Sequence, residues 1–180
     1  MSHIRIITDK EFGLEPKPFS FQPRERIGAR GIIINTDGNI AIFNKSNKNE
    51  YKLPGGGVDD GEDFEEAFKR EAMEETGCEI KIIKKLGTIV EEKSQDDFIQ
   101  VSHVFVAQVI KDTGTLHLTE KEVDEGAKLM WVSPEKGLEL ITNCINNLIG
   151  SKYENVYHTK FIVTRDRYIL EHYINDTNKQ

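Results

Sequence analysis

Three glutamates, Glu71, Glu74 and Glu75, stand at spacing i, i+3, i+4 in a stretch that the sequence predicts to be helical. At about 100° per residue, this spacing places the three carboxylates side by side, continuing the apolar stripe that Phe64 and Phe68 begin. Like charges at such spacing repel and raise one another's pKa. A hard divalent cation such as Mg²⁺ removes the conflict, because it takes carboxylate oxygens and shares its coordination shell with phosphate. The spacing therefore predicts a metal site.

A purely structural interpretation competes with this one. A run of charges on a helix is usually a solvated face, but such a face should lie opposite the apolar stripe and not above it. The ends of the helix are well marked: Asp63 with Glu66 three residues later fits a capping box, and Gly77 fits the left-handed position after the last turn. We therefore prefer the metal site, held on a helix of about four turns that begins near Phe64.

Three consecutive glycines, Gly55, Gly56 and Gly57, lead toward this helix. Glycine lets the backbone approach a ligand closely and adopt positive φ. A glycine-rich segment is more often only a turn, but joined to an acidic helix it indicates a loop whose amide or carbonyl groups complete a site for metal and phosphate. Arg30 and Lys52 flank this loop and are candidates for phosphate contacts. The competing and more common role of such residues is that of surface charges.

The rest of the chain predicts strands and helices that hold this element. Residues 29–35 and 40–43 are apolar and enclose an Asp-Gly turn, so they predict a hairpin. Ser133 and Pro134 predict the start of a helix that ends at Gly150. Further predicted elements are strands at 79–90, 98–110, 116–118 and 129–132 and a last helix near 160–174, in which residues 165–167 would form a salt-bridged surface.

This mixture predicts an α/β fold with a mixed β-sheet between helices. A chain of 180 residues is expected to form a single domain, 1–180. Within it, residues 1–27 would be an N-terminal arm or edge strand, because they hold three of the five prolines. Residues 151–180 would be a C-terminal helical extension.

Composition restricts the function further. A net charge of −7 argues against general binding to nucleic acid or anionic membranes, so an anionic substrate would need local basic groups or a bound cation. Cys78 and Cys144 show no metal-ligand spacing and predict reduced thiols. With no apolar run long enough to span a bilayer and no signal-peptide core, the expected location is the cytoplasm.

The stretch from Gly56 to Cys78 resembles the Nudix box, Gly-x5-Glu-x7-Arg-Glu-U-x-Glu-Glu-x-Gly-U, in which U is apolar. The fixed positions are met by Gly56, Glu62, Arg70, Glu71, Ala72, Glu74, Glu75, Gly77 and Cys78. The likeness extends over residues 29–149, including the Leu-Pro-Gly-Gly-Gly lead-in. It implies an α/β/α sandwich that hydrolyses nucleoside diphosphates linked to another group.

The resemblance also implies roles for individual residues. Glu71, Glu74 and Glu75 match the family's metal-binding acids, with the carbonyl of Gly55 as a further ligand and Mg²⁺ or Mn²⁺ as the ion. Arg70 matches the arginine that orients a glutamate of the box. The general base differs within the family: it is either Glu71 or an acid from a loop outside the box. The acidic loop here offers Glu120, Glu122, Asp124 and Glu125, of which we favour Glu122; the competing interpretation of each is a solvated charge.

The sequence thus predicts a metal-dependent pyrophosphohydrolase acting on a small-molecule nucleotide, with Arg30, Lys52, Gly56 and Gly57 as substrate contacts. The alternative is a non-catalytic nucleotide-sensing or nucleotide-binding module on the same fold. Nucleoside triphosphates, ADP-ribose-like molecules and related nucleotides all stay open as substrates. The apolar last helix raises the further expectation of a homodimer.

Overall fold

The computed structural model describes residues 3–178, which form one mixed sheet with helices on both faces. The strands are β1 His3–Thr8, β2 Arg24–Ile34, β3 Ile40–Lys45, β4 Glu50–Lys52, β5 Gly55–Gly57, β6 Cys78–Lys93, β7 Phe98–Asp112 and β8 Ala127–Val132. The α-helices are α1 Phe64–Thr76, α2 Glu120–Asp124, α3 Pro134–Cys144 and α4 Val156–Thr177. Short 3-10 helices cover η1 Asp9–Phe12, η2 Ser46–Lys48, η3 Ser94–Asp96 and η4 Ile145–Asn147.

The strand order is β1-β6-β7-β2-β3-β4, with β5 paired to β2 and β8 paired to β3. The pairs β1–β6 and β2–β7 are parallel, and the other pairs are antiparallel. Strand β2 changes partner along its length: Gly28–Arg30 pair with β5, and Ile34 pairs with Ile40 of β3. This exchange brings the glycine segment to the middle of the sheet.

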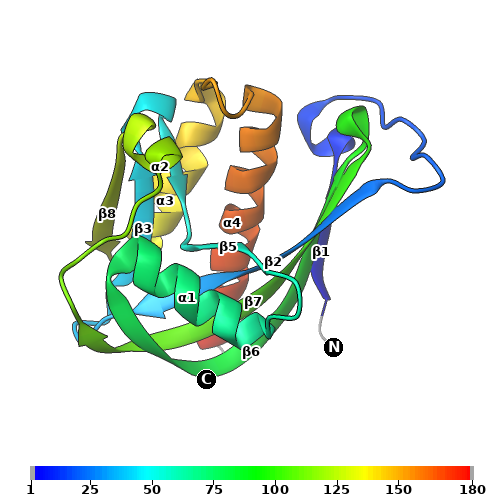
Figure 1. The fold of residues 1–180 in the computed structure, drawn as a ribbon. Coiled ribbons are helices and arrows are strands. Elements are labelled where there is room, and N and C mark those ends of the chain that lie inside the picture. Colours follow the sequence, from blue (N-terminus) through cyan, green and yellow to red (C-terminus); the bar gives the residue numbers. More distant parts are fainter. Residues whose placement is uncertain (1–2, 179–180) are drawn as a thin grey trace.

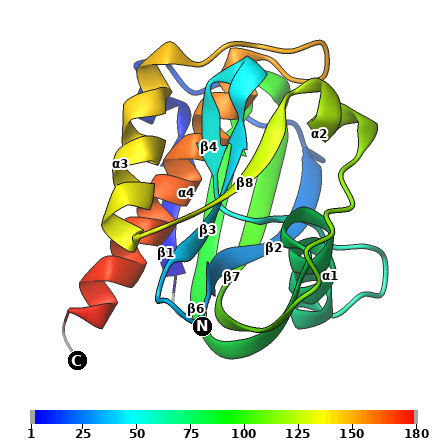
Figure 2. The same ribbon diagram turned by 90° about the vertical axis from the view of Figure 1, so that its left-hand side faces the viewer.

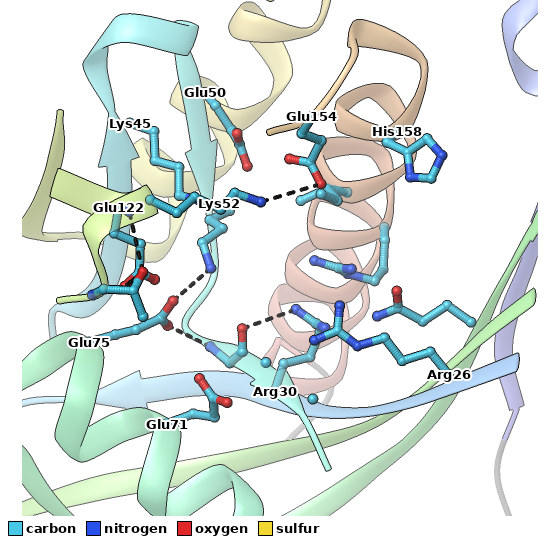
Figure 3. Close-up of a pocket in the computed structure, with 18 of the residues that line it drawn as sticks. Arg26, Arg30, Lys45, Glu50, Lys52, Glu71, Glu75, Glu122, Glu154 and His158 are labelled. Carbon is cyan, nitrogen blue, oxygen red and sulfur yellow. Dashed lines mark hydrogen bonds and ion pairs between the residues drawn. The ribbon is translucent and has the colours of Figure 1, made fainter. Parts of the chain in front are cut away.

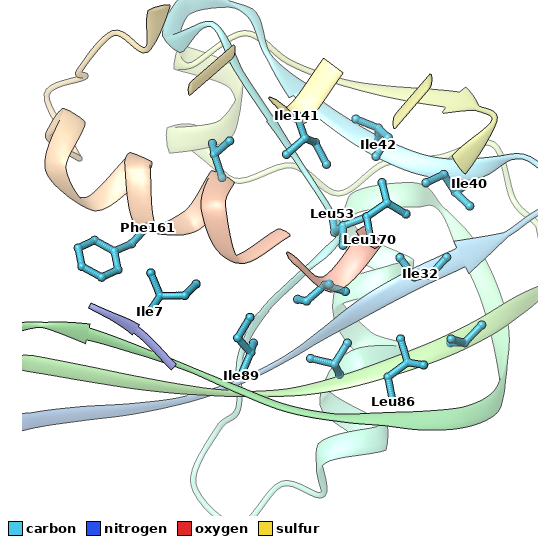
Figure 4. Packing of buried hydrophobic residues seen from close by; sticks show 14 of the residues in the cluster. Ile7, Ile32, Ile40, Ile42, Leu53, Leu86, Ile89, Ile141, Phe161 and Leu170 are labelled. Atoms are coloured by element: carbon cyan, nitrogen blue, oxygen red, sulfur yellow. The ribbon is translucent and has the colours of Figure 1, made fainter. Parts of the chain in front are cut away.

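Helix α1 covers one face of the sheet, while α3 and α4 cover the other (Figures 1 and 2). Beneath α1, the cluster around Ala67, Phe68 and Phe105 is buried. On the opposite face, Ile32, Phe161 and Leu170 belong to a larger buried cluster (Figure 4). Each fully buried side chain of this size contributes about 1.5–3 kcal/mol to folding. The layers confirm the predicted α/β/α sandwich.

The N-terminal strand β1 lies at one edge of the sheet, parallel to β6. The polar chain between η1 and β2 is held to the η3 turn, where Asp97 accepts hydrogen bonds from the Ser20 amide and hydroxyl. None of the helices in residues 3–178 is long and apolar enough to cross a membrane. The division of the chain into domains stays a prediction.

Several expected elements differ from the structure. The hairpin is confirmed at β2 and β3, but residues 116–118 are not a strand; they form an irregular connection, held in part by the His117 amide on the Glu74 carbonyl. Helix α3 ends at Cys144, well before Gly150. The last helix is longer than expected, and its apolar side chains pack in the core and not on a free face.

The expectation of an exposed salt-bridged surface at residues 165–167 is wrong for its first two members. Arg165 is 1% exposed and Asp166 is fully buried. Arg165 pairs with Glu91 of β6 at 3.0 Å, and Asp166 accepts the Leu53 amide at 2.9 Å. Arg165 also pairs with its neighbour Asp166 at 2.7 Å, but the other partners of these buried charges lie far away in the sequence.

Candidate active site

Helix α1 is fixed at both ends by local interactions. Asp63 has extended backbone angles, and its side chain accepts the Glu65 amide. Glu66 pairs with Lys69 at 2.8 Å. At the other end Gly77 is left-handed, with φ 68°, and its amide binds the Met73 carbonyl. A Cβ at Gly77 would lie 2.6 Å from the Thr115 carbonyl oxygen, so glycine is required there both for its positive φ and for its lack of a side chain. The predicted ends of the helix are confirmed, but the predicted capping box is not formed, because Asp63 accepts the Glu65 amide and Glu66 pairs with Lys69.

The three box glutamates differ in burial. The exposed fraction of the side chain is 4% for Glu75, 15% for Glu71 and 41% for Glu74. Glu71 and Glu75 line the main cavity, whereas Glu74 lies outside the set of residues that line it. The inward position predicted from the spacing is therefore found for Glu71 and Glu75 but not for Glu74.

Glu75 is held by two donors. Its Oε1 lies 2.7 Å from Lys52 Nζ, and its Oε2 accepts the Gly55 amide at 2.8 Å (Figure 3). Burial raises the pKa of Glu75 although Lys52 opposes the change, and the nearby charge of Glu122 raises the pKa further. A buried acid with another acid close by is the environment in which a cation stabilises the charged form.

Arg70 ties the glycine segment to the helix. Its Nε and Nη2 bind both oxygens of Glu62 at 2.9 Å, Nη2 also binds the Gly57 carbonyl at 3.0 Å, and Nη1 binds Glu71 Oε1 at 2.9 Å. The hydrogen bonds from Arg70 lower the pKa of Glu62 to about 2. The guanidinium therefore orients the Glu71 carboxylate through a fixed frame.

The glycine segment leaves no room for side chains. Strand β5 pairs with β2 through Gly55–Arg30, Gly56–Ala29 and Gly57–Gly28. A Cβ at Gly56 would lie 2.4 Å from Glu71 Oε1, so a side chain there would displace the carboxylate. The close approach inferred from the three glycines is thus an approach to the acidic helix itself.

Arg30 and Lys52 are not the surface charges that such residues usually are. Arg30 is 4% exposed and Lys52 is 8% exposed, and both line the cavity. Arg30 Nε binds Ser102 Oγ at 3.1 Å. Burial, together with the charge of Arg165, lowers the pKa of Arg30 to about 10. Positive charge of this kind, partly stripped of water, binds an anion strongly.

The cavity has a volume of about 250 Å³ and lies between α1, the glycine segment and α4. Five glutamates line it: Glu50, Glu71, Glu75, Glu122 and Glu154. Seven basic residues oppose them: Arg26, Arg30, Lys45, Lys52, Lys93, Lys121 and Arg165. Lys45, Lys93 and Arg165 are paired with acids that do not line the cavity, whereas Arg26 and Arg30 are local basic groups of the kind that an anionic substrate requires in a chain with net charge −7.

Of the four acids in the loop around α2, Glu122 lines the cavity, whereas Glu120, Asp124 and Glu125 do not. Glu122 Oε2 accepts the amide and the hydroxyl of Thr119 in a capping box. Burial opposes its ionisation, but the bonds from Thr119 outweigh it and lower the pKa of Glu122. Glu125 instead forms a buried ion pair with Lys45 at 2.8 Å. The geometry separates Glu122 from its neighbours; its role stays a prediction.

The donor set suits a hard cation in its chemistry, since Glu71, Glu75 and the Gly55 backbone supply oxygen ligands. The tight contact between Glu71 and Gly56 directs that carboxylate toward the loop. In residues 3–178 no three His, Cys, Asp or Glu side chains lie close enough together to hold a metal ion as they stand. Lys52 neutralises Glu75 in this arrangement.

The structure adds site residues that the sequence analysis missed. Arg26 and Glu50 line the cavity from the strands that carry Arg30 and Lys52. Arg26 lies four residues before Arg30 on β2, and Glu50 lies two residues before Lys52 on β4. Because side chains alternate between the two faces of a strand, each pair points to the same side, and this period of two is the pattern that identifies them. Glu154 and His158 come from the segment that leads into α4 and from α4 itself, and no local pattern connects them with α1.

The fold and this site define a class of protein in which an acidic helix follows a glycine strand within an α/β/α sandwich. The NUDIX domain family model matches residues 24–146. The chain belongs to the Nudix family.

Two solved structures share the fold: the MutT protein from Methanosarcina mazei Go1 and the ORF135 protein of E. coli. The first has a TM-score of 0.51 and 23% identity and covers 82% of this chain and 97% of its own. The second has a TM-score of 0.53 and 20% identity and covers 85% of this chain and 91% of its own.

A relative from Bacillus subtilis (strain 168), named "Putative 8-oxo-dGTP diphosphatase", is 36% identical over 107 residues. The match covers 59% of this chain and 66% of the relative, so it spans slightly less than two thirds of that protein's length.

Proposed function

We propose that the protein is a metal-dependent pyrophosphohydrolase that cleaves a nucleoside diphosphate linked to another moiety. The observation that carries this proposal is the cavity in which the acidic face of α1 meets a wall of buried basic residues across the glycine strand. Membership of the Nudix family supports it. The name of the Bacillus relative supports nucleoside triphosphates as the substrate class.

Glu71, Glu74 and Glu75, with the Gly55 carbonyl, are the residues we assign to hold Mg²⁺ or Mn²⁺. Such an ion, when bound, would neutralise charge on the phosphates and lower the pKa of water. Arg30 and Lys52, both buried, would bind the pyrophosphate oxygens together with Gly56 and Gly57. Arg70 would keep Glu71 in position through the frame it forms with Glu62.

We assign the general base to Glu122 ahead of Glu71. Glu122 lines the cavity, and Thr119 binds its Oε2, which leaves Oε1 to receive the proton of the attacking water. Glu71 Oε1, by contrast, accepts Arg70 Nη1 at 2.9 Å.

The test is product release from a panel of nucleotides, including nucleoside triphosphates and ADP-ribose, with Mg²⁺ or Mn²⁺ and with EDTA. We expect cleavage of a phosphoanhydride bond that depends on the metal, and identification of the products shows which phosphorus is attacked. A second candidate is a non-catalytic nucleotide-binding module, which the Lys52–Glu75 pair favours because it already neutralises an expected metal ligand. Metal-stimulated nucleotide binding without turnover of any substrate would decide for that candidate.

Arg70→Lys is expected to lower kcat roughly tenfold with little change in KM, because a lysine cannot reach Glu62, Gly57 and Glu71 at once. Steady-state kinetics on the best substrate of the panel measure the effect. Lys69→Arg is the matched control, since Lys69 pairs with Glu66 on the exposed side of the same helix. Equal kinetics for the two variants would contradict the positioning role of Arg70.

A further inference from the structure

The end of the cavity away from α1 has a different chemistry from the phosphate end. Figure 3 shows Glu50, Glu154 and His158 at this end, above Lys52 and Arg30. Both carboxylates contact the buried ammonium of Lys48, Glu154 at 2.6 Å and Glu50 at 2.7 Å, so they lie close together. The cavity therefore has an acidic end in addition to its basic wall.

Glu50 has unsatisfied hydrogen-bonding capacity. It lies on β4 two residues before Lys52, so both side chains point into the cavity, while Tyr51 between them packs on the core. The residue is fully buried. Lys48 Nζ contacts Oε2 at 2.7 Å, whereas Oε1 has no hydrogen-bond partner in the described part of the chain, so the carboxylate keeps lone pairs that no donor fills. Buried carboxylate oxygens without donors are costly, which points to a ligand that brings N–H or O–H groups.

The aromatic groups that line the cavity also lie toward this end. The rings of Phe98 and His158 are nearly parallel, with an interplanar angle of 17° and centroids 6.1 Å apart. A phenyl ring and an imidazole ring in one cavity with a hydrogen-bond acceptor form the kind of surface that recognises a nucleobase by stacking and by its edge. A ribose diol also brings two O–H donors, but it has no planar π-system to stack on these rings.

We propose that Glu50 is the residue that selects the nucleobase, and that it selects guanine. A carboxylate accepts two parallel N–H bonds, and the guanine edge offers two adjacent donors, the ring N1–H and the exocyclic N2–H. Adenine and cytosine each place a ring acceptor beside their amino group, so one oxygen of Glu50 would face a lone pair. This inference rests on the proposed function, because it assumes that the ligand is a nucleotide. Guanine and 8-oxoguanine share this edge, so Glu50 does not distinguish them.

The decisive variant is Glu50→Gln. An amide presents one acceptor and one donor, which match the amino group and the ring nitrogen of adenine. In the wild-type protein we expect kcat/KM for GTP to exceed that for ATP by about a hundredfold, with ITP, which lacks the amino group, in between. Glu50→Gln should reduce this preference at least tenfold and raise kcat/KM for ATP. Glu50→Asp keeps the charge beside Lys48 but shortens the side chain, which moves the acceptor away from the base. It should lower kcat/KM for GTP without raising kcat/KM for ATP.

The matched control is Glu125→Gln. Glu125 is 1% exposed and pairs with Lys45 in the same group of charges, and its Oε1 lies 3.9 Å from Lys48 Nζ, but it does not line the cavity. Its loss should leave the GTP-to-ATP ratio unchanged. Lys48 keeps Glu154 as a partner in Glu50→Gln, which favours a folded variant. Thermal unfolding of each variant checks this directly.

Binding of bismethylene analogues of GTP, ITP and ATP, in which both phosphoanhydride bridges are replaced, is measured by calorimetry and separates this proposal from the proposed function. If the protein hydrolyses nucleotides with no preference for guanine, the assignment of Glu50 is wrong and the proposed function stands. If it hydrolyses no nucleotide but binds the guanine analogue, and Glu50→Gln abolishes this binding, the assignment of Glu50 stands and the proposed function is wrong. The ribose is tested with dGTP. If kcat/KM for dGTP is far below that for GTP in the wild type, and this difference disappears in Glu50→Gln, then Glu50 binds the ribose and the proposal is wrong.

Discussion

Glu75→Gln is expected to lower kcat for metal-dependent nucleotide hydrolysis by roughly a thousandfold, since removal of a single charge-stabilising group from an active site has effects of this order. Glu75 is the most buried acid of α1, and its carboxylate contacts both Lys52 and the backbone of the glycine segment. The amide keeps the shape of the side chain but loses the charge. The measurement is steady-state product release with Mg²⁺ or Mn²⁺ at saturating nucleotide.

The buried position of Glu75 makes a folding defect a competing explanation, because the substitution leaves Lys52 without an anion of its own. Glu74→Gln avoids this difficulty, since the Glu74 side chain is 41% exposed. This variant should lose activity without losing stability. Glu66→Gln, on the exposed side of the same helix, is the control for charge alone. The rise in melting temperature on addition of metal and nucleotide should disappear with Glu75→Gln. Turnover within threefold of wild type in both Glu74→Gln and Glu75→Gln would rule out the assigned metal role.

Glu91→Gln is expected to lower the free energy of unfolding by about 3–5 kcal/mol, the usual cost of breaking a buried ion pair by removing one partner. Glu91 is fully buried on β6, 3.0 Å from Arg165 and 3.1 Å from Lys93. Without it, Arg165 keeps the Asp166 carboxylate at 2.7 Å, but buried Lys93 loses its ion-pair partner. Denaturant unfolding at neutral pH measures the loss, and Glu92→Gln, the same change on the other face of the strand, should cost far less.

The same residue predicts how stability depends on pH. Burial alone would raise the pKa of Glu91, but the charges of Arg165 and Lys93 outweigh burial and lower the pKa to about 2 from an ordinary 4.5. Its contribution of about 3 kcal/mol is therefore complete above pH 4.5 and is lost as the pH falls toward 2. The difference in stability between wild type and Glu91→Gln should shrink over this window. A difference that stays constant from neutral pH to pH 3 would contradict the depressed pKa.

Local interactions account for the features that were predictable from the sequence. The ends of α1 depend on Asp63 and Gly77, and the turn between β2 and β3 depends on a short polar segment, so the information lies within a few residues of each boundary. The packing side of α1 followed from its apolar spacing alone. The α/β/α layers then followed from the alternation of such elements.

Long-range interactions account for what could not be predicted. The burial of Arg30, Lys52 and Arg165 could not be predicted from local sequence, because a charged residue is buried only when partners compensate it. Those partners, Ser102, Glu75 and Glu91, are separated from them by 23 to 74 residues. No periodicity within one element carries that information. The acidic end of the cavity was not predicted for the same reason, since Glu50 and Glu154 are far apart in the sequence and come together at Lys48.

Helix α4 lies outside residues 24–146, the segment by which the family is identified, yet it supplies Phe161, Val163, Ile169 and Leu170 to the core. At about 1.5–3 kcal/mol for each side chain, these four residues contribute as much as the whole net stability of a typical domain. The segment that identifies the family, residues 24–146, is therefore shorter than the segment that forms the folded core, which includes α4. Because Asp166 also binds the Leu53 amide next to the glycine strand, substitutions in α4 can alter the pocket during evolution while the acidic helix stays unchanged.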